Sequence, residues 1–267
     1  MPVVLTDESV ANKTTILWNN YLTFPATVIS AGGATEGNPV ENIAHEATYN
    51  FWQAPDAFSA ITFFDFGMAR STSALGISGH TIATSGVSLV VLRYSTDGVT
   101  WVPLWTHTPT TNEDLLYLFP AENYRYWSVN FQGAAPIVSN MFLGPRLEFP
   151  YTPIEGYRPT HHSRKYTKYF NNSIEGHLLG NRVMSSGGTT TVEFPDLDRA
   201  FVDGPMRSFE DHYNRGRSFF YAGWPGGKPQ DVAYAWADGE DAMIDVAYTN
   251  GSKRASVGFG MSMFYGS

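Results

Sequence analysis

The sequence predicts a mainly β protein, with an N-terminal jelly-roll β-sandwich followed by a smaller α+β domain. Short runs rich in Val, Ile, Thr, Tyr and Phe are separated by turns, and the chain holds 25 Gly and 16 Pro. Hydrophobic residues make up 43% and aromatic residues 15% of the 267 residues, which is enough for a globular chain with a full core. A step in the charge pattern divides the chain into two parts.

The charge step lies near residue 155. Residues 1–155 hold five Lys and Arg against thirteen Asp and Glu, whereas residues 156–267 hold twelve of each. Together with the Pro-rich segment 149–159, this step predicts a sandwich domain over 1–150, with its core at about 35–150, and an α+β domain over 151–267. The acidic first part argues against nucleic-acid binding there, because phosphate recognition needs clustered Lys and Arg.

Three absences narrow the class of protein. The chain has no Cys, which excludes disulfides and thiolate metal sites. It has no apolar run of about 18 residues, so no membrane span is predicted. The first ten residues, MPVVLTDESV, lack a basic region followed by an apolar one, so no signal peptide is expected.

The strongest local signal in the first part is the segment 88–101, SLVVLRYSTDGVTW. Asp97-Gly98 between two β-rich runs predicts a hairpin, because Gly adopts a positive φ without steric cost. Trp101 and Trp127 lie in strong strand patterns and are expected in the core. The further strands of this part are predicted at 60–67, 74–82, 124–131 and 141–149, with short strands within 3–30.

The second part contains one good helix pattern, at 201–216. Pro205 suits a first helical turn capped by Asp203 or Gly204, and Gly216 suits the left-handed end of a helix. Met206, Phe209 and Tyr213 form one apolar stripe. Strands are predicted at 189–194, 218–224, 234–236 and 255–265, with a turn at 185–188, so we expect a small barrel or sheet with one helix.

No catalytic, cofactor or metal site is predicted, and we expect the protein not to be an enzyme. His161 and His162 are adjacent and would face opposite sides of a strand, so they cannot share one metal. Asp238, Glu240 and Asp241 crowd one turn, whereas glycosidase carboxylates flank a sugar from separate elements. These three acids are therefore interpreted as a solvated loop.

Three aromatic side chains are candidate glycan contacts: Trp52, Trp105 and His107. They lie in or beside the predicted loops 38–52 and 105–112. The C–H face of a sugar ring packs on an indole, although a tryptophan of a β-sandwich is more often part of the core.

The first part resembles the discoidin-like, or galactose-binding-like, module. The resemblance rests on the order of ITFFDFG at 61–67, YSTDGVTW at 94–101 and YRYWSVNF at 124–131, and it covers about residues 35–150. It implies a jelly-roll sandwich with ligand loops at one end. The calcium loop of that family does not match here, because 42–47 reads NIAHEA and offers few oxygen ligands, so no calcium is expected.

The whole chain resembles the distal-tail or minor-tail proteins at the tail tip of tailed bacteriophages. The segments that carry this resemblance are 209–224 and 256–265. It implies a virion structural protein that is assembled in the host bacterial cytoplasm and self-associates as a hexameric or trimeric ring. It also implies tube, hub and fibre proteins as partners, and a sandwich that touches host-surface glycans. A stand-alone carbohydrate-binding protein is the alternative hypothesis, and a glycan hydrolase is a third, less favoured one.

Overall fold

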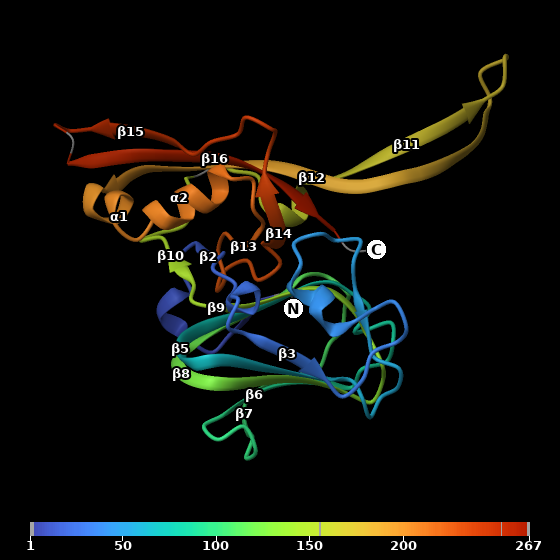
Figure 1. Ribbon diagram of the computed structural model, residues 1–267. Coiled ribbons are helices and arrows are strands. Elements are labelled where there is room, and N and C mark those ends of the chain that lie inside the picture. The colour runs from blue at the N-terminus through green and yellow to red at the C-terminus, as the bar shows by residue number, and fades with distance from the viewer. Residues whose placement is uncertain (1–2, 155, 252, 266–267) are drawn as a thin grey trace.

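The computed structural model describes residues 3–154, 156–251 and 253–265, which form two β-rich lobes (Figure 1). The mainly β class predicted from the sequence is confirmed. The first lobe contains strands β1 Val3–Leu5, β3 Val28–Ala31, β4 Trp52–Gln53, β5 Ile61–His80, β6 Leu89–Ser95, β7 Val102–His107, β8 Leu115–Gln132 and β9 Ile137–Gly144. The second contains β2 Thr15–Leu17, β10 Leu147–Glu148, β11 Arg164–Asn172, β12 Leu178–Asp198, β13 Phe219–Ala222, β14 Val232–Ala237, β15 Asp245–Thr249 and β16 Arg254–Phe264.

The first lobe is a β-sandwich whose two layers share the long strands β5 and β8. One layer joins β3, residues 61–65 of β5, residues 126–132 of β8, then β6 and β7. The other joins β4, β9, residues 70–80 of β5, residues 115–124 of β8, then β1. The pairing of β5 with β8 shifts register between Asp65 and Arg70. Because a register shift bends a strand, both strands pass from one layer to the other at this point.

The hairpin predicted at 88–101 is formed by β6 and β7. Gly98 has φ 75°, and Asp97 accepts hydrogen bonds from the N–H groups of Val99 and Thr100 at 2.8 and 2.7 Å. Those hydrogen bonds hold the pKa of Asp97 well below its usual range. Trp127 of β8 is fully buried, as predicted, within a core shared by both layers.

The second lobe is one sheet with the order β10-β2-β13-β14-β16-β12-β11, and β15 also pairs with β16. The strands predicted at 218–224, 234–236 and 255–265 correspond to β13, β14 and β16. The turn predicted at 185–188 is wrong, because β12 runs straight through it. Gly187 and Gly188 pair with Lys165 and Arg164, and a Cβ on Gly188 would lie 2.5 Å from the Ser163 carbonyl oxygen. Gly188 therefore permits close packing rather than a turn.

The predicted helix 201–216 is divided into α1 Arg199–Asp203 and α2 Arg207–Asn214. Pro205 falls between them, because its ring and missing N–H do not fit a helix interior. The stripe prediction is confirmed: Met206, Phe209 and Tyr213 are fully buried against the sheet. Gly216 has φ 70° just beyond α2, as predicted. The remaining helices are the 3-10 turns η1 Glu8–Val10, η2 Tyr21–Thr23, η3 Val40–Ala44 and η4 Thr160–His162. No helix in the described ranges is long and apolar enough to cross a membrane.

The two lobes are joined by an apolar core of their own. Leu17 and Phe220 lie in the second sheet, Ala74 and Phe142 lie in the sandwich, and all four are fully buried in one cluster. The chain also crosses between the lobes near its start, because β2 pairs with β13 and β10 in the second sheet. A division at residue 150 stays a prediction, and β2 belongs to the second sheet whichever boundary is chosen.

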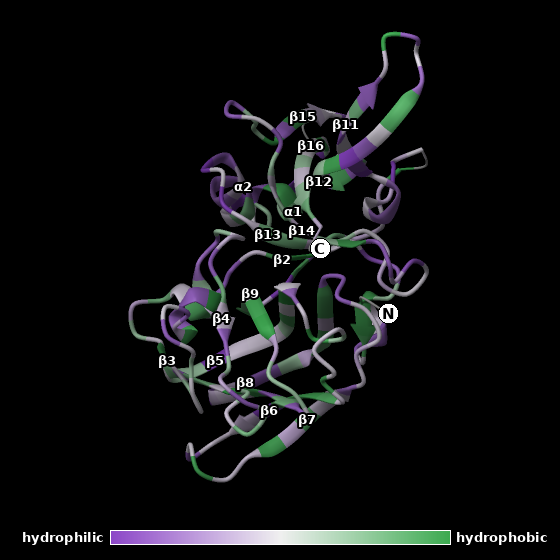
Figure 2. Cartoon of the chain, turned by 90° about the vertical axis from the view of Figure 1, so that its right-hand side faces the viewer, coloured by the Kyte–Doolittle hydropathy of each residue, from purple (hydrophilic) through white to green (hydrophobic). Residues whose placement is uncertain are grey.

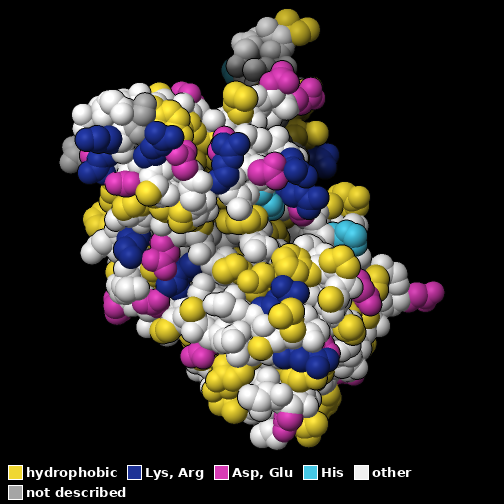
Figure 3. All heavy atoms as spheres, turned by 60° about the vertical axis from the view of Figure 1, so that its left-hand side comes forward, with side chains coloured by type: hydrophobic (Ala, Val, Ile, Leu, Met, Phe, Trp, Pro, Cys, Tyr) yellow, Lys and Arg dark blue, Asp and Glu magenta, His cyan; other side chains and the backbone are white. Residues whose placement is uncertain are grey.

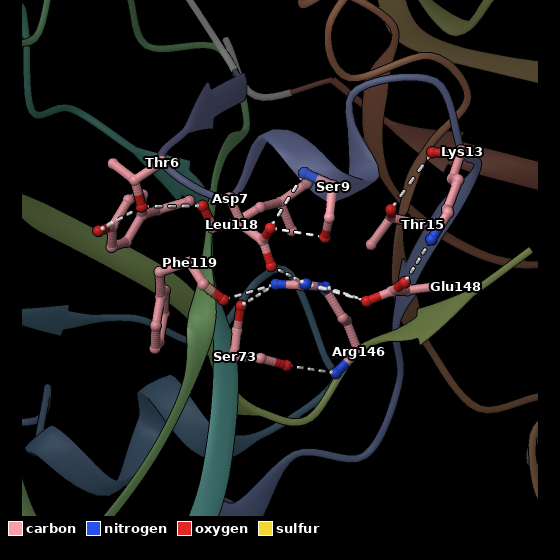
Figure 4. A network of polar contacts seen from close by, with 11 residues as sticks. Thr6, Asp7, Ser9, Lys13, Thr15, Ser73, Leu118, Phe119, Arg146 and Glu148 are labelled. Carbon is pink, nitrogen blue, oxygen red and sulfur yellow. Dashed lines mark hydrogen bonds and ion pairs between the residues drawn. The ribbon is translucent and has the colours of Figure 1, made fainter.

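Two buried polar centres reinforce this junction. The guanidinium of Arg146, whose side chain is 5% exposed, pairs with Asp7 at 2.5 Å and Glu148 at 2.9 Å (Figure 4). It also donates to the carbonyl oxygens of Ser73 and Phe119. The second centre is Asp114.

Asp114 connects one strand of each lobe. Its fully buried carboxylate accepts from the Ser78 hydroxyl at 2.5 Å, in β5, and from the Tyr234 N–H at 2.7 Å, in β14. Burial raises its pKa to about 6.

Candidate functional site

The most unusual surface of the protein is a hairpin that projects from the second sheet, which we call the arm (residues 164–184). It consists of β11, a turn at 173–177 and the first residues of β12 (Figure 1). Within the turn, the Ser173 N–H donates to the His177 carbonyl, and Gly176 has φ 85°. Among the described residues, β11 is hydrogen-bonded to β12 alone. The arm is therefore a two-stranded ribbon beyond the edge of the lobe.

The arm exposes apolar side chains along its length. Every residue of β11 is exposed, and hydrophobic and hydrophilic segments follow one another along the hairpin (Figure 2). The exposed large apolar side chains are Tyr166, Tyr169, Phe170, Ile174, Leu178, Leu179, Val183 and Met184. Exposed apolar surface of this extent marks an interaction site, and an isolated two-stranded hairpin is only marginally stable in water. The arm has the properties of a protein-binding surface.

The charge of the arm is positive. It carries Arg164, Lys165, Lys168 and Arg182 against the single acid Glu175. Arg164 lies over the Tyr265 ring at 4.6 Å, and Lys168 lies 5.9 Å from the Tyr166 ring. The arm thus combines an apolar surface with cations that form no salt bridge to the described residues.

The sequence around Arg164, Lys165 and Lys168 indicates a basic face on a solvated or interface strand, but the hairpin that this strand forms with residues 178–184 was not predicted. A signal was present in the sequence. Asn171-Asn172-Ser173 and Gly176 are turn residues between two β-rich runs, which is a hairpin pattern with a longer loop.

The histidine pair lies at the base of the arm, in the 3-10 turn η4 and not on a strand. The two rings are neighbours, with centroids 4.1 Å apart, so the expectation that they face opposite sides is wrong. Burial, followed by the neighbouring His162, lowers the pKa of His161. In the described part of the chain, no group of three His, Asp or Glu side chains is arranged to hold a metal ion.

The candidate glycan contacts Trp52, Trp105 and His107 are not brought together at an open surface. Trp52 is fully buried and donates its Nε1–H to the Gly33 carbonyl at 3.0 Å. Trp105 is 8% exposed and stacks on Tyr117 and on His107, whose pKa is lowered by burial. Glycan contact by these residues stays a prediction, and the burial of the two indoles weighs against it because their faces are occupied.

Trp101 lies closer to the surface than the sequence predicted. It was expected in the core but is only partly buried, because it faces outward onto Phe63, with ring centroids 5.5 Å apart. The two rings line a shallow depression of about 250 Å³ together with Tyr126 and Asp65. Asp65 is held by Arg125 through two bonds of 2.6 and 2.8 Å, and this pairing lowers its pKa. The depression presents fixed aromatic faces beside a charged pair.

A groove of about 600 Å³ lies between η2 and α2, at the junction of the lobes. Its cations are matched by acids: Arg207 pairs with Glu210 at 3.4 Å, and Arg215 pairs with Asp211 at 3.1 Å. Figure 3 shows the side of the molecule on which α1 and α2 lie, where Lys and Arg stand beside Asp and Glu on the second lobe. Because these charges are paired within the chain, the groove shows no preference for an ion of either sign.

The acidic turn that contains Asp238, Glu240 and Asp241 is exposed, as predicted for a solvated loop. Asp238 accepts from the Ser262 hydroxyl at 2.7 Å, which ties the turn to β16. All three acids lie on the connection between β14 and β15, so they do not face one another across a substrate cleft.

Comparison with known proteins gives no family assignment. No family model matches the chain, and no curated protein matches it. Among solved structures, the chain is similar to a family 89 glycoside hydrolase from Clostridium perfringens, with a TM-score of 0.39 and 12% identity. That match covers 46% of this chain and only 14% of the hydrolase.

Two smaller structures are matched over most of their length. One is the module CBM32-1 from a family 31 glycoside hydrolase of Clostridium perfringens, with a TM-score of 0.40, 12% identity, and coverage of 45% of this chain and 95% of the module. The other is a pectin-binding carbohydrate-binding module, with a TM-score of 0.36, 17% identity, and coverage of 44% and 89%. The structures named here are carbohydrate-active proteins and not tail proteins. At this level of similarity they do not assign a function to the chain.

Proposed function

We propose that this protein is a non-catalytic structural component of an oligomeric assembly, whose copies are joined through the arm. The observation that supports the proposal is the exposure of eight large apolar side chains on a ribbon without a core of its own. Such side chains gain free energy when a partner removes them from water. The assembly that the sequence resemblance suggests is the tail tip of a tailed bacteriophage, with the protein located in the virion.

Size-exclusion chromatography with light scattering tests the proposal directly. The arm variant replaces Tyr169, Phe170, Leu178 and Leu179 with Ser, all of which are more than half exposed. We expect the wild type to form oligomers and the arm variant to self-associate about a hundredfold more weakly or worse. Both should unfold at the same temperature as monomers, because these side chains are outside every buried core.

A matched control replaces four exposed apolar residues of the sandwich with Ser: Tyr49, Phe58, Met68 and Val99. The control should assemble like the wild type. A wild type that stays monomeric at its highest soluble concentration would disprove the proposal. Mass spectrometry of purified phage particles tests the tail-tip assignment separately, since a virion component must be present in them.

Carbohydrate binding by the sandwich is a second candidate function. The observation that favours it is the depression lined by Phe63, Trp101 and Tyr126, because partly exposed aromatic rings beside a charged pair suit a sugar ring. A glycan array with the wild type and Trp101→Ala tests it. Glycan binding by the wild type that is lost in Trp101→Ala supports carbohydrate binding. An array on which the wild type binds no glycan contradicts carbohydrate binding and leaves the assembly proposal unaffected.

A further inference from the structure

The second sheet has a free edge at the end opposite the arm. There, β15 is hydrogen-bonded to β16 and to no other strand of the described residues. Figure 1 shows β15 and the arm at opposite ends of this sheet. Because an unpaired strand offers a row of free N–H and C=O groups, it is a template for pairing with another chain. Met243 and Tyr248, which are 68% and 46% exposed, add apolar surface beside this edge.

The charge of this edge is opposite to that of the arm. The segment 238–245 holds four acids and neither Lys nor Arg. None of the four forms a salt bridge within the described parts of the chain. Glu240, Asp241 and Asp245 also accept no side-chain hydrogen bond there, whereas Asp238 accepts from Ser262. On the arm, Lys165, Lys168 and Arg182 are likewise without an acid in the described ranges.

The edge is held in place by the body of the lobe. The Ile244 N–H donates to Asn214 at 3.0 Å, and the Tyr248 hydroxyl donates to Asp203 at 2.5 Å. Arg199 pairs with the same Asp203 at 2.7 Å. The backbone and charges of the edge are therefore presented as a preformed surface, which lowers the entropic cost of docking.

We infer that the arm of one copy docks along β15 and the segment 238–245 of a second copy. The inference rests on the proposed function and adds the surface that receives the arm. An apolar, basic ribbon meets a free, acidic strand edge, so backbone pairing, apolar burial and charge all favour the same contact. Because the arm and the edge are different surfaces of one copy, the contact is heterologous and repeats head to tail, closing a ring or extending a filament.

A complementation experiment tests this contact. The edge variant replaces Glu240, Asp241 and Asp245 with Lys, and we expect it to self-associate about tenfold more weakly or worse. The arm variant keeps an intact edge, and the edge variant keeps an intact arm. Each should be monomeric alone where the wild type is oligomeric, and a 1:1 mixture should form heterodimers only, because one competent contact remains.

The control for the edge variant has the same change in net charge on the sandwich: Glu8, Glu36 and Glu41 replaced with Lys. These acids are exposed, and this control should assemble like the wild type. Circular dichroism and thermal unfolding of each purified variant establish that it is folded before it is mixed.

Crosslinking gives an independent measurement, because the chain has no Cys. A mixture of Thr167→Cys, in the arm, and Ala247→Cys, in β15, should yield a crosslinked dimer with a short bis-thiol reagent. Neither variant alone should do so, nor should Thr167→Cys mixed with Val99→Cys, which lies in the exposed turn of the sandwich.

The outcomes separate this inference from the proposed function. An edge variant that assembles like the wild type overturns the inference and leaves the arm as an assembly surface, with arm-to-arm pairing or another protein as its partner. Two monomeric variants whose mixture stays monomeric overturn it as well. A wild type that never assembles overturns both.

Discussion

Arg146 is the single residue on which most polar contacts of the junction depend. Its guanidinium pairs with Asp7 and Glu148 and donates to two carbonyl groups of the sandwich (Figure 4). We expect Arg146→Met to lower the free energy of unfolding by about 3–5 kcal/mol, because the poorly solvated Asp7 loses its cationic partner and two carbonyl groups of the sandwich lose their donor. Urea denaturation measures the change. Lys13→Ala, which removes a more exposed partner of Glu148, should cost about 1 kcal/mol or less; an equal effect of both variants would contradict the argument.

The raised pKa of Asp114 predicts how the stability of the protein depends on pH. Burial raises its pKa to about 6 in the folded protein, above the ordinary value of 3.8, so the folded state binds a proton that the unfolded state releases between these values. Protonation therefore favours folding, and this contribution to stability grows as the pH falls from about 7 to 4. Asp114→Asn is neutral at every pH, and its amide can still bond Ser78 and Tyr234.

The comparison of Asp114→Asn with the wild type isolates this group, since Asp231 also has a pKa raised by burial to about 6. We subtract the free energy of unfolding of the wild type from that of the variant at each pH, as measured by urea denaturation. This difference should be more favourable to the variant at pH 7 than at pH 4.5. A difference between Asp114→Asn and the wild type that is the same at both pH values would show that the pKa of Asp114 is not raised.

At the scale of elements, the arm should be the least protected part of the dilute monomer. Its strands have a partner on one side only and no apolar core beneath them, so local opening costs little free energy. We expect the backbone amides of 164–184 to exchange rapidly with deuterium in the monomer and to become protected on assembly. Those of β16, which is paired on both sides, should stay protected throughout. Slow exchange of the arm in the monomer would contradict this description.

Elements fixed by local chemistry were predictable, and those fixed by distant partners were not. The hairpin around Gly98 and the stripe of Phe209 and Tyr213 depend on neighbours in sequence, so the pattern alone predicts them. The place of β2 in the second sheet depends on strand β13, about 200 residues later, and no local pattern records it. Trp101 and Trp127 look alike in sequence, but only the structure shows which of them has its face covered.

The candidate surfaces were predicted less well than the fold. The position of Trp52 and Trp105 beside predicted loops made them candidate glycan contacts, yet both are covered by packing that only the folded sandwich creates. Conversely, the apolar residues of the arm resemble ordinary strand residues in sequence. They are unusual only because no layer of the same chain lies over them, and this is a property of tertiary structure.

At the scale of the whole molecule, the shared core predicts that both lobes unfold together. Phe220 of the second sheet packs directly on the backbone of Gly76 in the sandwich, where an added Cβ would lie 2.5 Å from its ring. Phe142 and Tyr234 surround the same ring, so it has no room to move aside. Differential scanning calorimetry of the wild type should therefore show one cooperative transition, because unfolding of either lobe exposes the apolar cluster that the two lobes share.

Gly76→Val places a branched side chain in this contact and should force the lobes apart. We expect the free energy of unfolding to fall by about 1–3 kcal/mol, and the melting temperature to fall by about 2–4 °C for each kcal/mol lost. The transition should broaden or divide into two. Gly180→Val is the matched control, because a Cβ at that position of the arm meets no atom within 4 Å. One sharp transition of Gly76→Val at the wild-type temperature would mean that the junction does not couple the lobes. A transition that divides into two would show that each lobe retains a core of its own.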